Sequence, residues 1–187
     1  MPFYIGLVHY PVYNKNNEVI TTAITNFDIH DIARTARTYN SAGYFIIHPL
    51  ENQQILANEI INYWQTGFGG QYNNDRKDAL SIIEIAPDIS SVINTISLRN
   101  GNEPFTVTTD ARRFENSVSY KELREIITTE KRPCLLLFGT GWGIENSVMS
   151  QFDYILEPIR GAGDYNHLPV RAAVAVILDR LLGEEWY

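Results

Sequence analysis

The chain has 187 residues and a formal net charge of −7; 44% of its residues are hydrophobic and 20% are charged. This length and composition suit a single globular domain over residues 1–187 and exclude wholesale disorder. The acidic balance argues against a general nucleic-acid coat, although a few clustered cations can still hold a nucleic acid locally.

Cysteine content and apolar runs bear on the compartment. Cys134 is the sole cysteine, which excludes an intrachain disulfide and a cysteine-rich zinc site. The start Met1–Tyr4 has no basic segment ahead of an apolar stretch, so we expect no signal peptide. The apolar run Ala172–Leu178 is too short to span a bilayer. These observations predict a cytoplasmic protein without a membrane segment.

Apolar runs alternate with helical patterns along the whole chain, which is typical of an α/β domain with a mostly parallel sheet flanked by helices. The predicted strands are Phe3–Tyr10, Tyr44–His48, Ser81–Ile85, Phe105–Thr109, Cys134–Phe138 and Tyr154–Leu156. The predicted helices are Asp28–Tyr39, Glu51–Gln65, Ile89–Ser97, Tyr120–Thr129, Ile144–Met149 and Pro169–Leu182.

One irregular stretch interrupts this alternation. Residues 67–75 are rich in glycine and asparagine, which predicts a loop. The aromatic residues Trp64, Phe68 and Tyr72 beside it can cover the core, line a substrate cleft or join a dimer contact. Core cover is the commonest of these roles, and we expect it here.

The last helix has the clearest pattern. Its apolar residues follow one helical stripe from Val170 to Leu181. Pro169 suits the first turn, where a missing N–H costs nothing, and Asn166 is a good capping residue just ahead of it. Gly183 suits the far end.

A glycine turn follows the apolar strand Cys134–Phe138. The spacing of Gly139, Gly141 and Gly143 suggests a dinucleotide fingerprint, but Ile144 stands where the third glycine of that motif belongs. The sequence also lacks the Gly-Lys-Ser/Thr of a Walker motif. A nicotinamide-dependent oxidoreductase is therefore a weak alternative function. The other interpretation of the glycines is a tight structural turn without a ligand.

Three motifs together resemble a known superfamily. Phe138-Gly139-Thr140-Gly141-Trp142-Gly143, Leu156-Glu157-Pro158-Ile159 and Asn166-His167-Leu168-Pro169-Val170-Arg171 look like the cofactor motifs of SPOUT RNA methyltransferases. Nearly the whole chain is similar to a small bacterial branch of this superfamily. The resemblance implies a deep C-terminal trefoil knot, S-adenosylmethionine (SAM) as the cofactor, an RNA substrate (tRNA or rRNA) and a homodimer with its active site at the subunit interface.

By position, the resemblance also implies which residues bind the cofactor. They belong to three loops with apolar side chains and backbone donors, which suit a nucleoside. The residues are Thr108, Thr109, Phe138, Gly139, Thr140, Gly141, Gly143, Leu156, Pro158, Ile159, Tyr165, Asn166, His167 and Leu168.

Arg34 is the catalytic candidate. Related RNA 2′-O-methyltransferases carry an Asn-x-Gly-x-x-x-Arg motif, and Asp28, His30 and Arg34 occupy its positions here. The changes at the first two positions leave open whether a ribose or a base atom accepts the methyl group. His30 is a second catalytic candidate, as a general base near neutral pH.

Basic residues next to these motifs are the RNA-binding candidates: Arg34, Arg37, Arg112 and Arg113. Arg76 and Lys77 form another basic pair, for which solvated surface is the ordinary interpretation. The predicted reaction is in-line methyl transfer to RNA, which requires no metal. The alternative is a non-catalytic knotted module with an RNA-binding or regulatory role.

Overall fold

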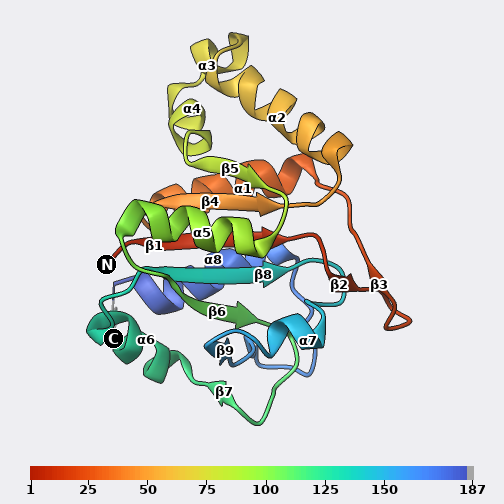
Figure 1. The fold of residues 1–187 in the computed structure, drawn as a ribbon, viewed down its shortest axis with the longest axis vertical. Helices are drawn as coiled ribbons and strands as arrows, with labels where there is room; N and C mark the ends of the chain where they lie inside the picture. The colour runs from red at the N-terminus through yellow and green to blue at the C-terminus, as the bar shows by residue number, and fades with distance from the viewer. Residues whose placement is uncertain (185–187) are drawn as a thin grey trace.

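The structure is a computed structural model that describes residues 1–184, and this part of the chain contains one seven-stranded parallel sheet (Figure 1). The strands lie in the order β5-β4-β1-β8-β6-β9-β7. Their bounds are β1 Phe3–Val8, β4 Gly43–Ile47, β5 Ile83–Ala86, β6 Phe105–Thr109, β7 Ser117–Val118, β8 Cys134–Gly139 and β9 Tyr154–Leu156. The central strands are buried almost throughout because apolar side chains occupy both of their faces.

Helices cover both faces of the sheet, as predicted. One face carries α1 (Asn26–Thr38), α2 (Glu51–Gln65), α4 (Asn74–Leu80), α6 (Tyr120–Thr129) and α8 (Val170–Leu182). The other face carries α5 (Ile89–Asn100) and α7 (Asn146–Met149), which lie in front of the sheet in Figure 1. The five-residue helix α3 (Phe68–Tyr72) packs against α2 at one end of the molecule.

The strand order reverses at the centre of the sheet. From β1 the chain moves outward to β4 and β5, and it then returns to build β6, β8 and β9 on the other side of β1. In open parallel sheets the carboxyl ends of the strands leave a crevice at such a reversal, where ligands bind. The glycine turn after β8 lies at this edge.

The prediction of a loop over residues 67–75 is wrong, because α3 and α4 occupy this stretch. The asparagine that suggests a loop is a helix cap: the Asn73 side chain accepts a hydrogen bond from Arg76 N at 2.9 Å. The glycines allow close packing, since a Cβ on Gly70 would lie 2.2 Å from the carbonyl oxygen of Trp64. Core cover is wrong for Phe68 and Tyr72, which are 69% and 81% exposed, whereas Trp64 packs half-buried against the core.

Smaller differences have local causes. The hairpin of β2 (Val12–Tyr13) and β3 (Val19–Ile20) was not predicted, because strands of two residues carry no periodic signal. The prediction that Asn166 caps α8 is wrong: Pro169 is at the cap position, and the Asn166 side chain donates to the Ala111 carbonyl at 2.7 Å. Cys134 is buried, as expected. No helix in residues 1–184 is long and apolar enough to cross a membrane.

Candidate functional site

A cavity of about 900 Å³ opens at the carboxyl ends of β6 and β8, within the range of about 300–1,000 Å³ typical of small-molecule pockets. Its walls come from segments far apart in the sequence: residues 22–28 before and in α1, 109–112 after β6, 138–143 after β8, and 159–173 leading into α8. The fold therefore brings together the loops that the sequence motifs single out.

The glycine turn forms one wall, and its conformation requires glycine. Gly141 and Gly143 have φ values of 60° and 97°. A Cβ on Gly143 would lie 2.6 Å from Asp110 Oδ2, and one on Gly141 would lie 2.8 Å from the Tyr13 carbonyl oxygen. The turn is held from behind, because Trp142 N donates to the Tyr13 carbonyl at 2.9 Å. The wall that faces the cavity is thus largely bare backbone.

A chain of hydrogen bonds ties this turn to the segment before α1. The Thr140 hydroxyl donates to the Val8 carbonyl at 3.0 Å, so it must accept from Thr22 Oγ1. Thr22 Oγ1 in turn accepts from His9 Nδ1, 3.0 Å away. Burial, followed by the nearby His48, lowers the pKa of His9 to about 4, and the hydrogen bond with Thr22 offsets only part of this shift. The ring is therefore neutral and serves as a fixed donor.

The entry to α8 forms another wall. Ile159 and Leu168 contribute apolar surface, and the first turn of a helix leaves backbone N–H groups free for a polar ligand. The bond from Asn166 to Ala111 fixes the 159–168 loop against the loop after β6. The cavity thus offers both apolar side chains and backbone N–H groups to a ligand.

Charged side chains around the cavity are paired. Arg171 lies 3.4 Å from the Asp31 carboxylate and 4.0 Å from that of Asp28, which joins the start of α8 to α1. Arg112 donates through Nε and Nη2 to Asp110, both at 2.9 Å, and the Asp110 side chain is 4% exposed. The site therefore offers carboxylates for a cationic ligand group and guanidinium groups for an anionic one.

Most of the predicted cofactor residues line this cavity: Thr109, Phe138, Gly139, Thr140, Gly141, Gly143, Ile159, Asn166, His167 and Leu168. The side chains of Thr108, Leu156 and Pro158 are instead buried in the protein. Thr108 and Thr109 differ because successive side chains on a strand point to opposite faces. Tyr165 is 78% exposed and packs edge-on against His167, with ring centroids 5.6 Å apart.

The catalytic candidates lie on α1, one to two turns beyond its cavity end. The His30 ring stands edge-on to Trp64 at 5.3 Å, and burial, followed by the charge of Arg76, lowers its pKa. Arg34 is exposed, and Arg37 is bound to Asp78 with Nε 2.7 Å from the carboxylate. Of the other RNA-binding candidates, Arg112 lines the cavity and Arg113 is exposed.

Several lining residues were missed by sequence reasoning. Asp110 directly follows β6, and the rule that ligands gather at the carboxyl ends of parallel strands would have found it. Phe27 is seven positions before Arg34, a spacing that places both on one helical face. Thr22 and Arg171 carry no signal of this kind, because their roles come from tertiary contacts with Thr140 and α1.

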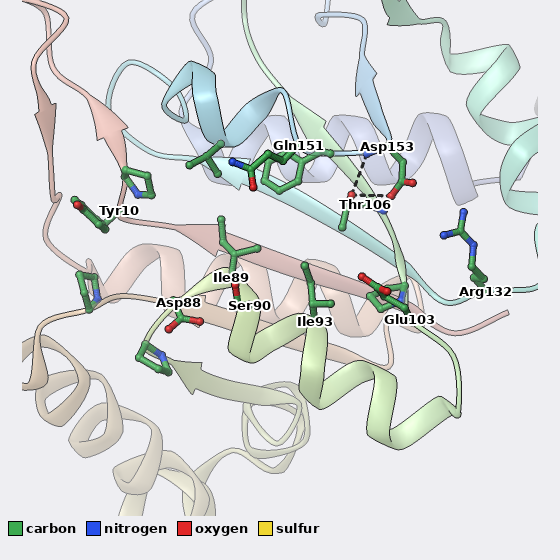
Figure 2. Close-up of a pocket in the computed structure, with 16 residues that line it drawn as sticks. Tyr10, Asp88, Ile89, Ser90, Ile93, Glu103, Thr106, Arg132, Gln151 and Asp153 are labelled. Carbon is green, nitrogen blue, oxygen red and sulfur yellow. Dashed lines mark hydrogen bonds between the residues drawn. The ribbon is translucent and has the colours of Figure 1, made fainter.

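A second cavity, of about 670 Å³, lies on the other face of the sheet beside α5 (Figure 2). Its charged lining consists of Asp88, Glu103, Asp153 and Arg132, whose guanidinium pairs with Glu130 at 3.2 Å. Thr106 donates its N–H and hydroxyl to Asp153, at 2.7 and 2.8 Å. This acidic lining disfavours a ligand that carries a carboxylate or phosphate, so the larger cavity is the candidate site.

Comparison with solved structures supports the fold. The SpoU methyltransferase AviRb from Streptomyces viridochromogenes, solved in complex with AdoMet, superposes with a TM-score of 0.58. The alignment covers 96% of this chain and 56% of that chain at 15% sequence identity, so it bears on the fold alone.

Two curated relatives are closer in sequence. An uncharacterized protein of Aquifex aeolicus is 46% identical over 178 residues, covering 95% of this chain and 87% of that protein. A Nitratidesulfovibrio vulgaris protein named tRNA (guanine-N(1)-)-methyltransferase is 42% identical over 181 residues. The match covers 97% of this chain but 42% of that relative, so the chain spans less than half of its length.

The SAM-dependent RNA methyltransferase family matches residues 2–183, almost the whole chain. Together with the cavity built from its three motif loops, this match establishes that the chain belongs to the SAM-dependent RNA methyltransferases.

Proposed function

We propose that the 900 Å³ cavity binds SAM and that RNA approaches it along α1, with Arg34 at the acceptor nucleotide. The observation that carries this proposal is the meeting of the glycine turn, the end of β6 and the entry to α8 in one cavity. The nicotinamide alternative has no comparable support, because the fingerprint for that cofactor is missing from the sequence.

The residues present fit SAM. The bare backbone of Gly139–Gly143 gives a close approach to the nucleoside, and Ile159 and Leu168 supply apolar surface for its base. Asp110 and Asp28 place buried carboxylates in the lining of the cavity, which suits a sulfonium cation. Arg171 and the helix entry suit the carboxylate of the methionine part.

When bound, SAM supplies a methyl group on a positively charged sulfur, which is intrinsically reactive. The protein's task is therefore mainly to hold the acceptor in line and exclude water. Arg34 orients a phosphate or the acceptor group, and Arg112 and Arg113 hold the RNA backbone through charge. His30 is neutral near pH 7, because its pKa is lowered, so its ring is in the form that a general base requires.

The finer architecture is part of the same proposal. The contact between Asn166 and Ala111 brings the loops before α8 and after β6 together, which supports a trefoil knot there. Phe27, Trp142 and Leu168 are 67%, 62% and 44% exposed around the cavity, which supports a homodimer that buries them. We further propose that residues 1–187 act as one cytoplasmic domain and that tRNA is the substrate, in line with the name of the longer relative.

The test is methyl transfer from labelled SAM to bulk tRNA and, separately, to rRNA from cells that lack this protein. We expect Arg34→Ala to keep the donor affinity measured by calorimetry and to lose at least a hundredfold in single-turnover transfer. Arg99→Ala, an exposed arginine on α5, is the matched control and should retain activity. Unchanged transfer by Arg34→Ala contradicts its assignment, and absence of transfer by the wild-type protein contradicts the proposed function.

A further inference from the structure

An aromatic surface extends over α2 and α3, at the end of the molecule next to β5 (Figure 1). We define it as Tyr63, Phe68 and Tyr72, which are 50%, 69% and 81% exposed. Large aromatic side chains are among the residues that a folded protein normally buries. Their exposure together, on adjacent helices, therefore indicates a surface that contacts a partner.

Close packing of glycine keeps these rings outside the core. A Cβ on Gly69 would lie 2.6 Å from the Tyr63 ring and 2.8 Å from the Trp64 ring, so α3 sits directly on α2. The outward side of α3 then carries Phe68 and Tyr72, whose rings are nearly parallel at an angle of 22° with centroids 6.5 Å apart. Both rings are therefore largely accessible to solvent.

Cations lie beside these rings. The Arg76 guanidinium is 4.7 Å from the centroid of the Trp64 ring, and Lys77 and Arg34 are exposed on the neighbouring helices α4 and α1. Two of the nearby carboxylates are already paired, Asp78 with Arg37 and Asp31 with Arg171. Glu59 on α2 and Asp75 on α4 are also exposed, so the three cations only slightly outnumber the remaining carboxylates on these helices, in a chain that is acidic as a whole.

One face of α1 connects this surface to the cavity. Phe27 lines the cavity mouth, and Arg34 lies on the same face of the helix seven residues later. At a rise of about 1.5 Å per residue, the two are about 10 Å apart along the helix axis. Next to Arg34, the ring of His30 contacts Trp64, which adjoins the aromatic surface. An RNA strand whose acceptor nucleotide is at the cavity can thus continue over the surface of α2 and α3.

We propose that the aromatic surface binds an unpaired segment of the RNA substrate, with bases stacked on Phe68, Tyr72 and Tyr63 and phosphates beside Arg34, Arg76 and Lys77. This inference rests on the proposed function. Rings next to cations match a polymer that offers both flat bases and anionic phosphates, and a duplex does not expose its base faces. The surface therefore selects single-stranded RNA, such as a loop.

The experiment measures binding of a fluorescent oligoadenylate of about ten nucleotides, within the site sizes known for single-strand binders. An abasic ribose-phosphate oligomer of the same length and charge is the matched probe. We expect Phe68→Ala/Tyr72→Ala to bind oligoadenylate at least tenfold more weakly and to leave the abasic probe nearly unchanged. Phe68→Tyr/Tyr72→Phe should bind like the wild type, and so should Leu98→Ala, which removes an exposed apolar side chain on α5.

Donor affinity, measured by calorimetry, reports whether each variant is folded; if the alanine variant fails this check, Phe68→Leu/Tyr72→Leu replaces it. Equal loss for both probes, or unchanged binding of both, overturns the inference. So does a variant that dissociates a dimer while it keeps oligoadenylate affinity, because the surface then binds a second copy. In the labelled transfer assay, no transfer by the wild type contradicts the proposed function. If the wild type is active and the Phe68→Ala/Tyr72→Ala variant is equally active at limiting RNA, the result contradicts only this inference.

Discussion

The cavity and the aromatic surface use glycine for opposite purposes. At the cavity, Gly141 and Gly143 adopt positive φ, so backbone is exposed to the ligand. At the aromatic surface, Gly69 and Gly70 let α3 lie against α2, so backbone is covered and the aromatic side chains are displaced outward. One site is therefore built from main chain and the other from side chains.

This difference has a consequence for mutation. A site made of backbone depends on conformation, so replacing a glycine there alters the binding surface itself. A site made of exposed side chains tolerates substitutions that preserve aromatic character, and it fails when the packing beneath it fails. The following changes test the contrast, beginning with the largest expected effect.

Gly143→Ala should weaken donor binding. The new Cβ would need to occupy space 2.6 Å from Asp110 Oδ2 at a φ of 97°. Backbone strain of this kind costs roughly 1–3 kcal/mol, which corresponds to about a 5- to 150-fold weaker Kd for SAM in calorimetry. Gly101→Ala is the control: its φ is also positive, at 73°, but it caps α5 with no atom within 4 Å of the added Cβ. Equal loss in both variants would contradict a local effect.

Gly70→Ala should affect the aromatic surface instead of the cavity. A Cβ 2.2 Å from the Trp64 carbonyl oxygen forces α3 away from α2, at a cost of about 1–3 kcal/mol in unfolding free energy. We expect thermal unfolding at a lower temperature and weaker oligoadenylate binding, with donor affinity within twofold of the wild type. Weaker donor binding would show that the cavity and the aromatic surface are not independent.

Glu145→Ala should have the smallest effect, and one that depends on pH. Glu145 caps α7 just after the glycine turn and accepts hydrogen bonds from Ser147 N and from the Tyr13 hydroxyl, each at 3.0 Å. These bonds, chiefly those from Ser147, lower the pKa of its carboxyl group to about 2 from 4.5. The carboxylate therefore stabilises the fold above pH 4.5, and that contribution is lost as pH falls towards 2.

We expect Glu145→Ala to cost about 1 kcal/mol in unfolding free energy at pH 7. The difference from wild type should shrink between pH 4.5 and 2. Denaturant melts at several pH values measure it, with the exposed Glu115→Ala as a control. A difference independent of pH would show that packing, rather than the charged cap, is responsible.

Much of the fold follows from sequence periodicity. The predicted strand Cys134–Phe138 and helix Pro169–Leu182 are strongly patterned, and the structure confirms both to within one residue, as Cys134–Gly139 and Val170–Leu182. The prediction for residues 67–75 failed because glycine and asparagine occur in loops, in closely packed helices and at helix caps alike. Their role in close helix packing and capping depends on Trp64 and Arg76, which no local window relates to them.

The candidate site was predictable only in part. The glycine turn and the α8 entry stand out in sequence because they require glycine and a helix start. Contacts between elements distant in sequence give Asp110, Arg171 and Thr22 their roles. A single sequence does not reveal which distant residues meet, so these roles could not be predicted from it. Arg37 and Arg112 appear as free cations in the sequence, whereas the fold gives each a carboxylate partner.

The direction of α8 determines where additional polypeptide can join this domain. α8 starts at the cavity and runs back across the sheet, so its last residues emerge at the edge where β1 begins (Figure 1). The start of β1 and the end of α8 therefore lie on the side of the sheet away from the cavity. A longer chain that carries this domain, as does the relative matched over 42% of its length, can continue from either point without covering the cavity.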